Sequence, residues 1–144
     1  MSKENDLARH IAENRMLDKD AFSKWIGINI LHVTPGNCTV QCVVREDMLN
    51  GFFIAHGGIA YSVADSALAF ASNAHNDKAV SVETSISHVK KVEVGDVLTA
   101  VCTEKNLSRR FGIYEVSVLN QKNQLVAIFK GTVYRTGEKW VENT

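Results

Sequence analysis

The spacing of hydrophobic and polar residues changes along the chain from a helical to a strand-like pattern and back. Residues 3–25 contain two short helical patterns, with Asp18 as a candidate N-cap of the second and Gly27 as its end. From Ile28, apolar and polar residues alternate in the runs INILHV and CTVQCVVR, as they do in half-buried strands. The TPGN segment between these runs predicts a tight turn.

The longest helical pattern, over residues 57–75, is apolar on every side. Most residues from Ile59 to Ala74 are apolar, so we expect this helix to be buried nearly all round. Three or four strand-like runs follow, with short links that favour antiparallel neighbours: AVSVETSISHV, DVLTAVCTEKN, GIYEVSVLN and LVAIFKGTVYRT. This order predicts an α+β domain in which one curved antiparallel sheet wraps around one long central helix. A second copy of the chain could cover the rest of that helix.

Length, charge and cysteine content narrow the class of protein. The 144 residues suit one domain, and the net charge of zero gives no support for binding to nucleic acid or an anionic membrane. The N-terminus lacks the apolar stretch of a signal peptide, so we expect a cytoplasmic protein that does not enter a membrane. Cys38, Cys42 and Cys102 lie in strand-like sequence and are expected to be buried, reduced thiols. No CxxC spacing supports a zinc site.

Asp65 is the one acid in the apolar segment MLNGFFIAHGGIAYSVADSALAFASNAHN. Burying a carboxylate is unfavourable unless the group is paired or hydrogen-bonded. Asp65 could therefore be structural, capping a neighbouring element or contacting a partner subunit. Alternatively, it is a nucleophile or general base, because loss of hydration makes a carboxylate more basic.

Gly57 and Gly58 follow His56 and begin the predicted helix. Their backbone can approach a ligand closely, and the first N–H groups of a helix are unpaired at the positive end of its dipole. Such groups can polarise a carbonyl or hold an oxyanion, although the glycines could also merely permit a bend. HGG alone is a weak motif, and its spacing does not match a phosphate-binding P-loop.

The spacing of Gly57 and Asp65 separates them too far to act on one carbon from the same helix. Eight residues of helix span roughly 12 Å, and the Asp side chain recovers only part of that distance. Reacting atoms must approach to about 3–3.5 Å. Two antiparallel copies of the helix could bring Gly57 of one chain to Asp65 of the other, so we expect two equivalent sites at a twofold interface.

The segments MLNG, HGG, ADSALAFASN, VSVE and VGD together resemble the hotdog-fold thioesterases, specifically the phenylacetate-pathway (PaaI-type) branch, over residues 20–136. The resemblance implies a single hotdog domain over residues 1–144, in which an antiparallel sheet surrounds one helix. It also implies homodimers that pair into homotetramers and cleave acyl-CoA thioesters with water. It implies no metal and no cofactor, since coenzyme A is part of the substrate.

The resemblance also assigns roles to individual residues. Asp65 corresponds to the nucleophile or general base, and Gly57 to the donor of the backbone N–H that polarises the carbonyl. Asn50 corresponds to the residue that orients the carbonyl or the water. His56 corresponds to a histidine that helps to hold the loop or the thioester, and Ser81 to a polar residue that positions water in some relatives.

The chain departs from many relatives before VGD, where His88 replaces an aromatic residue and Lys91 a proline. The favoured acyl group therefore stays open between aryl-acetyl groups and short or medium aliphatic chains. Basic side chains could contact the phosphates of coenzyme A or remain solvated, and aromatic ones could line the substrate site or pack in the core. The candidate substrate-binding residues are Gly58, Tyr61, Lys90, Lys91, Arg109, Arg110 and Phe111.

Two other functions remain open. A hotdog hydratase or dehydratase acting on acyl thioesters would use a histidine and an acid, such as His56 and Asp65. The proline- and glycine-rich segment that follows the histidine in those enzymes is missing from this sequence. A non-catalytic acyl-CoA-binding or assembly subunit is the remaining alternative.

Overall fold

The computed structural model describes residues 2–142. Its N-terminal segment is a series of short α-, π- and 3-10-helical elements. The segment consists of α1 (Lys3–His10), the π-helical turn η1 (Ile11–Met16), the 3-10 turn η2 (Leu17–Lys19) and α2 (Ala21–Ile26). The predicted N-cap of α2 is wrong by two residues: Asp20 accepts the Ser23 N–H at 3.0 Å. Asp18 lies inside η2 and accepts a hydrogen bond from Asn14 instead. Gly27 ends α2 with φ of 84°, as predicted.

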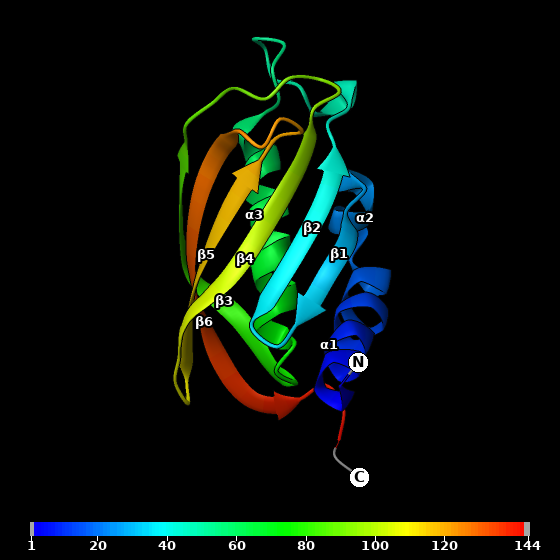
Figure 1. The fold of residues 1–144 in the computed structure, drawn as a ribbon, viewed down its shortest axis with the longest axis vertical. Helices are drawn as coiled ribbons and strands as arrows, with labels where there is room; N and C mark the ends of the chain where they lie inside the picture. The colour runs from blue at the N-terminus through cyan, green and yellow to red at the C-terminus, as the bar shows by residue number, and fades with distance from the viewer. Residues whose placement is uncertain (1, 143–144) are drawn as a thin grey trace.

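The six strand-like runs all form strands of one antiparallel sheet (Figure 1). Along the chain the strands are β1 (Asn29–Thr34), β2 (Asn37–Val43), β3 (Asp77–His88), β4 (Val97–Leu107), β5 (Phe111–Leu119) and β6 (Leu125–Lys139). Their order across the sheet is β1-β2-β4-β5-β6-β3. The expectation that short links join neighbours is wrong for β3 and β4. The link over residues 89–96 crosses one end of the sheet, and β3 pairs with β6 at a free edge.

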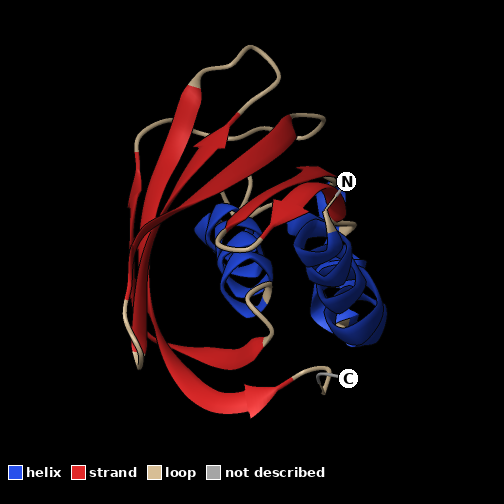
Figure 2. Ribbon diagram, turned by 60° about the horizontal axis from the view of Figure 1, so that its bottom comes forward, coloured by secondary structure: helices blue, strands red, loops and turns tan. Residues whose placement is uncertain are grey.

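The long helix α3 (Gly57–Asn73) follows the short 3-10 turn η3 (Glu46–Met48) and packs inside the curve of the sheet, which Figure 2 shows. Small residues allow a close approach. At Gly131 of β6 an added Cβ would lie only 2.5 Å from Leu68 Cδ2 of α3. The buried residues of α3 form one continuous core with those of the sheet. The predicted α+β architecture, one sheet around one central helix, is confirmed.

One stripe of α3 remains partly exposed in the single chain, so burial is less complete than the sequence predicts. The N-terminal segment covers part of the side that faces away from the sheet (Figure 2). The partly exposed positions of α3 after Gly57 recur at helical spacing and are Gly58, Tyr61, Ser62, Asp65 and Ala69.

Cysteine burial agrees with the sequence-based expectation. Cys38, Cys42 and Cys102 are buried free thiols. The indole N–H of Trp140 donates to Asn73 Oδ1 at 2.8 Å, which fastens the chain after β6 to the end of α3. Within residues 2–142, every helix is too short or too polar to cross a membrane.

Candidate active site

The first N–H of α3 is free because of the way the helix begins. His56 is the N-cap, and its Nδ1 accepts the Gly58 N–H at 2.9 Å, while its carbonyl accepts the Ile59 N–H. For the Gly57 N–H, residues 2–142 provide no hydrogen-bond acceptor. This N–H therefore lies at the positive end of the helix dipole and can bind a carbonyl oxygen.

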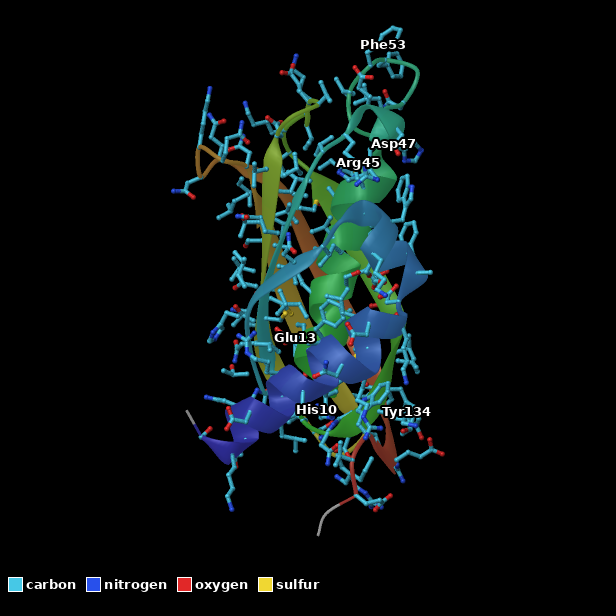
Figure 3. The ribbon with its side chains drawn as sticks, turned by 90° about the vertical axis from the view of Figure 1, so that its right-hand side faces the viewer. His10, Glu13, Arg45, Asp47, Phe53 and Tyr134 are labelled. Atoms are coloured by element: carbon cyan, nitrogen blue, oxygen red, sulfur yellow. The ribbon has the colours of Figure 1, made fainter. Side chains whose placement is uncertain are left out.

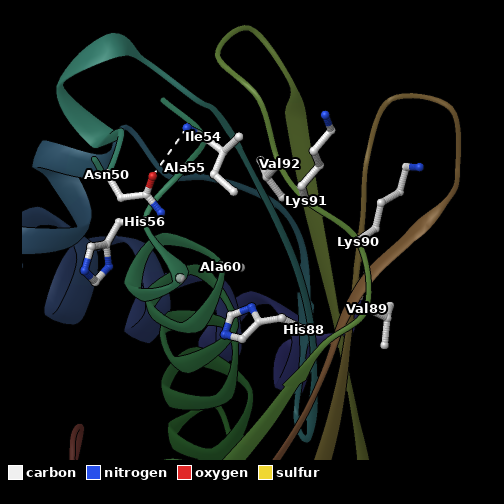
Figure 4. Close-up of a pocket in the computed structure, with 11 residues that line it drawn as sticks. Asn50, Ile54, Ala55, His56, Ala60, His88, Val89, Lys90, Lys91 and Val92 are labelled. Atoms are coloured by element: carbon white, nitrogen blue, oxygen red, sulfur yellow. Dashed lines mark hydrogen bonds between the residues drawn. The ribbon is translucent and has the colours of Figure 1, made fainter. Parts of the chain in front are cut away.

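A cleft of about 360 Å³ opens beside this N–H (Figure 4). We call it the glycine cleft; it is lined by Asn50, Ile54, Ala55, His56, Gly57, Ala60, His88, Val89, Lys90, Lys91 and Val92. His88 lies over the start of α3, with its Nε2 3.3 Å from where a Gly57 Cβ would be. Glycine at this position keeps the cleft open between the helix and the imidazole.

Asn50 stabilises the loop that leads to the glycine cleft through its side-chain oxygen, and its side-chain NH2 group has no partner within residues 2–142. Its Oδ1 accepts the Phe52 N–H at 2.9 Å and the Ile54 N–H at 3.4 Å, so the loop turns around this side chain (Figure 4). Within residues 2–142 no acceptor binds Asn50 Nδ2, which therefore remains able to donate to a ligand in the glycine cleft. Phe53 is at the exposed tip of this loop, at the opposite end of the molecule from His10 (Figure 3).

Asp65 lies on a second cleft of about 300 Å³, away from the glycine cleft. We call it the aspartate cleft; it is lined by Met16, Asp65, Leu68, Ala69, Ser72, Asn73, Ala79, Val80, Ser81, Val133 and Trp140. Burial raises the pKa of the Asp65 carboxyl above its ordinary value, and the negative charge of Asp20 raises it further. The two clefts share no lining residue, so one chain brings Asp65 together with Ser81 but not with Gly57.

Gly58 and Tyr61 have local partners that do not involve a ligand. The Gly58 N–H is taken by His56, although Gly58 lines a separate cleft beside Phe22 and Trp25. The Tyr61 hydroxyl lies 2.6 Å from Thr84 Oγ1, and its ring packs edge-on against Phe129 at 5.4 Å. Tyr61 thus joins α3 to the sheet. Of the two roles left open by the sequence, packing in the core rather than lining the substrate site accounts for its position.

The predicted basic residues divide between the two ends of the sheet. Lys90 and Lys91 line the glycine cleft and an adjoining polar cleft that also contains Lys122. Phe111 pairs with Tyr134, and Tyr134 pairs with Val80, so the hairpin with Arg109 and Arg110 lies at the end where β3 begins. Phe111 packs its ring edge-on against Tyr134. Of the four predicted basic residues, Lys90 and Lys91 therefore border the glycine cleft of their own chain, and Arg109 and Arg110 do not.

Residues 52–127 match the model of a family described as the thioesterase superfamily. The chain belongs to the thioesterase superfamily. It is 34% identical over 122 residues to acyl-coenzyme A thioesterase PaaI of Escherichia coli, covering 85% of this chain and 87% of that protein.

Solved structures place this thioesterase among the PaaI-type hotdog proteins. The structure of the E. coli PaaI protein from the phenylacetic acid degradation operon matches with a TM-score of 0.91 and 32% identity, over 94% of this chain and 97% of that chain. A Streptococcus mutans protein, solved bound to acetyl CoA, matches with a TM-score of 0.75 and 27% identity, over 78% of this chain and 90% of that chain. The predicted family and hotdog fold are confirmed, and the chain is a thioester hydrolase.

The thioesterase site has two neighbours that the sequence analysis missed. The negative charge of Asp20 raises the pKa of Asp65, and the assignment of the α2 cap to Asp18 drew attention away from Asp20. His88 lies directly over Gly57, whereas the sequence showed it only as a replacement for an aromatic residue. Better use of the N-cap preference of Asp20 could have found the first. No sequence signal reveals the second, because it depends on where β3 ends.

Proposed function

We propose that this chain hydrolyses the thioester of an aryl-acetyl-CoA, or of another small or medium acyl-CoA, to the free acid and coenzyme A. The unpaired Gly57 N–H at the start of α3, inside a cleft bordered by Lys90 and Lys91, carries this conclusion. The N–H suits a thioester oxygen, and the ammonium groups suit the phosphates of coenzyme A. The relationship to an acyl-coenzyme A thioesterase supports the same substrate class.

The working enzyme contains two copies of the chain. β3 is a free edge of the sheet, where Val80 and Val82 are 58% and 57% exposed, and unpaired edges favour pairing with another strand. The aspartate cleft lies between this edge and the partly exposed stripe of α3. A copy that runs antiparallel along β3 and α3 brings Asp65 of the partner subunit toward Gly57. Two such dimers pair into the homotetramer that the family resemblance implies.

Each group then has one task in the reaction. The Gly57 N–H polarises the thioester carbonyl, and Asn50 Nδ2 orients the carbonyl or the attacking water. Asp65 of the partner subunit either attacks the carbonyl carbon or removes a proton from water that attacks it. The C–S bond breaks, and the thiolate leaves and takes up a proton. When Asp65 itself attacks, the acyl group remains on Asp65 as a mixed anhydride, and water then cleaves this anhydride to release the acid and restore the carboxylate. Ser81 positions water beside the carboxylate, and His56 holds the loop as the N-cap of α3.

Coenzyme A lies along the open side of the glycine cleft in this proposal, with its phosphates near Lys90 and Lys91. The antiparallel dimer adds the β4–β5 hairpin of the partner subunit, because that hairpin lies at the end of the sheet where β3 begins. Arg109, Arg110 and Phe111 of the partner subunit are therefore proposed to reach the nucleotide. The reaction uses no metal or other cofactor, so a chelator should leave the rate unchanged.

Release of free thiol from a panel of benzoyl-, phenylacetyl-, hexanoyl- and decanoyl-CoA tests this function and ranks the acyl groups. Hydrolysis of at least one thioester is expected. With an enoyl-CoA added to the panel, loss of enoyl absorbance without free thiol would support a hydratase or dehydratase instead. Binding without turnover would support an acyl-CoA-binding subunit. We also propose a cytoplasmic location, which suits three buried free cysteines.

A further inference from the structure

Buried hydroxyl groups join the N-terminal segment to the turn of α3 that carries Asp65. Ser23 Oγ lies 2.6 Å from Asp20 Oδ2 and 2.8 Å from Ser66 Oγ. Ser23 is 1% exposed and Ser66 is 9% exposed, so water does not replace these contacts. Because an ionised carboxylate can only accept, Ser23 donates its proton to Asp20, and Ser66 must donate to Ser23. The bridge therefore has a fixed direction while Asp20 carries its charge.

We propose that Asp20 is a positioning residue for Asp65 of the same chain, acting through Ser23 and Ser66 and through its own negative charge. This inference rests on the proposed function, which gives Asp65 the role of nucleophile or general base. Ser66 follows Asp65 directly in α3, so fixing Ser66 against α2 also fixes the helical turn that carries the carboxylate.

The charge of Asp20 has no competing neighbour in the aspartate cleft. The residues that line this cleft together with Asp65 and come from η1, β3, β6 and the C-terminal segment are uncharged: Met16, Ala79, Val80, Ser81, Val133 and Trp140. Asp20, at the start of α2, is the charged group of the described chain that raises the pKa of Asp65, in addition to burial. A higher pKa makes the carboxylate a stronger base near neutral pH.

The Asp20→Asn variant removes this charge, and asparagine is as good an N-cap as aspartate, so α2 should be preserved. Its amide NH2 would donate to Ser23 Oγ where the carboxylate accepted, so kcat of this variant reports the charge and the bridge together, and the pH of the acidic limb reports the charge. We expect the acidic limb of its kcat/KM profile to move to lower pH, since Asp65 loses a repelling neighbour. Asp18→Asn is the matched control: it removes the same charge two residues earlier, where the carboxylate accepts a hydrogen bond from Asn14. Its profile should overlay that of the wild type. An unmoved limb in Asp20→Asn, or an equal movement in both variants, overturns the inference.

Ser23→Ala separates the bridge from the charge. It removes the hydroxyl that joins Asp20 to Ser66 but leaves the carboxylate of Asp20 in place. We expect kcat to fall while the acidic limb stays at the wild-type pH. A wild-type kcat in a folded Ser23→Ala protein would overturn the positioning role.

A titration of the Asp65 carboxyl by carbon-13 NMR distinguishes failure of this inference from failure of the proposed function. Wild-type protein that releases no thiol would refute the function, and Asp65→Asn that keeps the full rate would refute the role that the function gives to Asp65. The NMR titration does not depend on turnover. The Asp65 carboxyl should titrate at lower pH in Asp20→Asn than in the wild type, and an unchanged titration overturns the inference even if the enzyme is active.

Discussion

Gly57 and Asp65 lie on the same helix, eight residues apart, but they border two different clefts. The rise of the helix accounts for this separation, since eight residues span roughly 12 Å. The Gly57 N–H and the Asp65 carboxylate of one chain thus cannot act on the same carbon. A twofold axis that places the glycine cleft of each chain beside the aspartate cleft of the other would create two complete sites.

Mixing two inactive variants should restore activity if each site takes Gly57 and Asp65 from different chains. Asp65→Asn removes the base, and Gly57→Pro removes the N–H at the first helical position, where proline is tolerated. His56 has φ of −55° and ψ of 137°, which suits a residue before proline. With free exchange of subunits, half of the dimers are mixed and half of their sites are intact, giving about a quarter of wild-type activity. Thiol release from the mixture measures this.

Gly57→Ala is the control for the proline variant. It keeps the N–H and adds a Cβ 3.3 Å from His88 Nε2, which the flexible imidazole can accommodate by a small shift. We expect Gly57→Ala to retain much more activity than Gly57→Pro. If the mixture of Asp65→Asn and Gly57→Pro stays as inactive as its parents, although the subunits exchange, the shared site is refuted.

Asp65→Asn alone should lower kcat by roughly 10²–10⁴-fold, the contribution typical of a general base. The side chain keeps its shape, so the fold and the dimer should remain intact by circular dichroism and size-exclusion chromatography. A fall of less than tenfold in a folded dimer would show that the carboxylate is not the base.

The raised pKa of Asp65 predicts opposite effects of pH on activity and on stability. Activity needs the ionised carboxylate, so the acidic limb of kcat/KM should lie above the ordinary range of aspartate. The folded protein holds the Asp65 proton more tightly than the unfolded chain, so this group makes the free energy of unfolding decrease as pH rises through the interval between the two pKa values. Thermal unfolding at neutral pH should therefore occur at an equal or higher temperature in Asp65→Asn than in the wild type.

His56 should matter more for stability than for the chemical step. Its Nδ1 accepts the Gly58 N–H, so His56→Ala leaves a helix donor unpaired and should lower the free energy of unfolding by about 1 kcal/mol, the usual loss for an N-cap. We expect a smaller fall in kcat than for Asp65→Asn. His56→Asn offers another cap acceptor and should recover most of the stability in thermal unfolding. A rate loss in His56→Asn as large as that of Asp65→Asn would instead make His56 a catalytic group.

Local patterns in the sequence predict the elements well, because alternation and helical spacing reflect which faces are buried. The strand runs and the helix over residues 57–75 are confirmed, although α3 ends at Asn73. The predicted N-cap of α2 is wrong because Asp18 and Asp20 are equally suitable cap residues. Asp18 lies inside the 3-10 turn η2, so α2 begins after Asp20. Spacing along a helix also predicts the separation of Gly57 from Asp65.

The sequence does not predict which segments far apart along the chain contact one another. The length of the link over residues 89–96 does not reveal that it crosses the sheet, so the pairing of β3 with β6 was not predicted. The same arrangement decides that Lys90 lies at the glycine cleft while Arg109 lies at the other end of the sheet. The hydrogen bond between Ser23 and Ser66 joins residues 43 positions apart, and no periodic pattern marks it.

Lys90 and Lys91 provide a test of where coenzyme A binds. Both line the glycine cleft, and Lys91 forms an exposed ion pair with Glu93 that contributes little to stability. Replacing both lysines by alanine should raise KM for an acyl-CoA severalfold with little change in kcat, because the lost interactions bind substrate and transition state alike. KM for the same acyl group on a pantetheine thioester, which lacks the nucleotide, should not change.

Lys105→Ala is the control for the two lysines, because Lys105 pairs with Glu115 on β5, away from the glycine cleft. It should leave KM for acyl-CoA unchanged. Arg109→Ala and Arg110→Ala tell whether the partner subunit also contacts the nucleotide, since these arginines lie far from the cleft of their own chain. A raised KM for acyl-CoA in the arginine variants, with the pantetheine thioester unaffected, requires a neighbouring subunit at the site. Equal effects of the lysine variant on both thioesters would place the phosphates elsewhere.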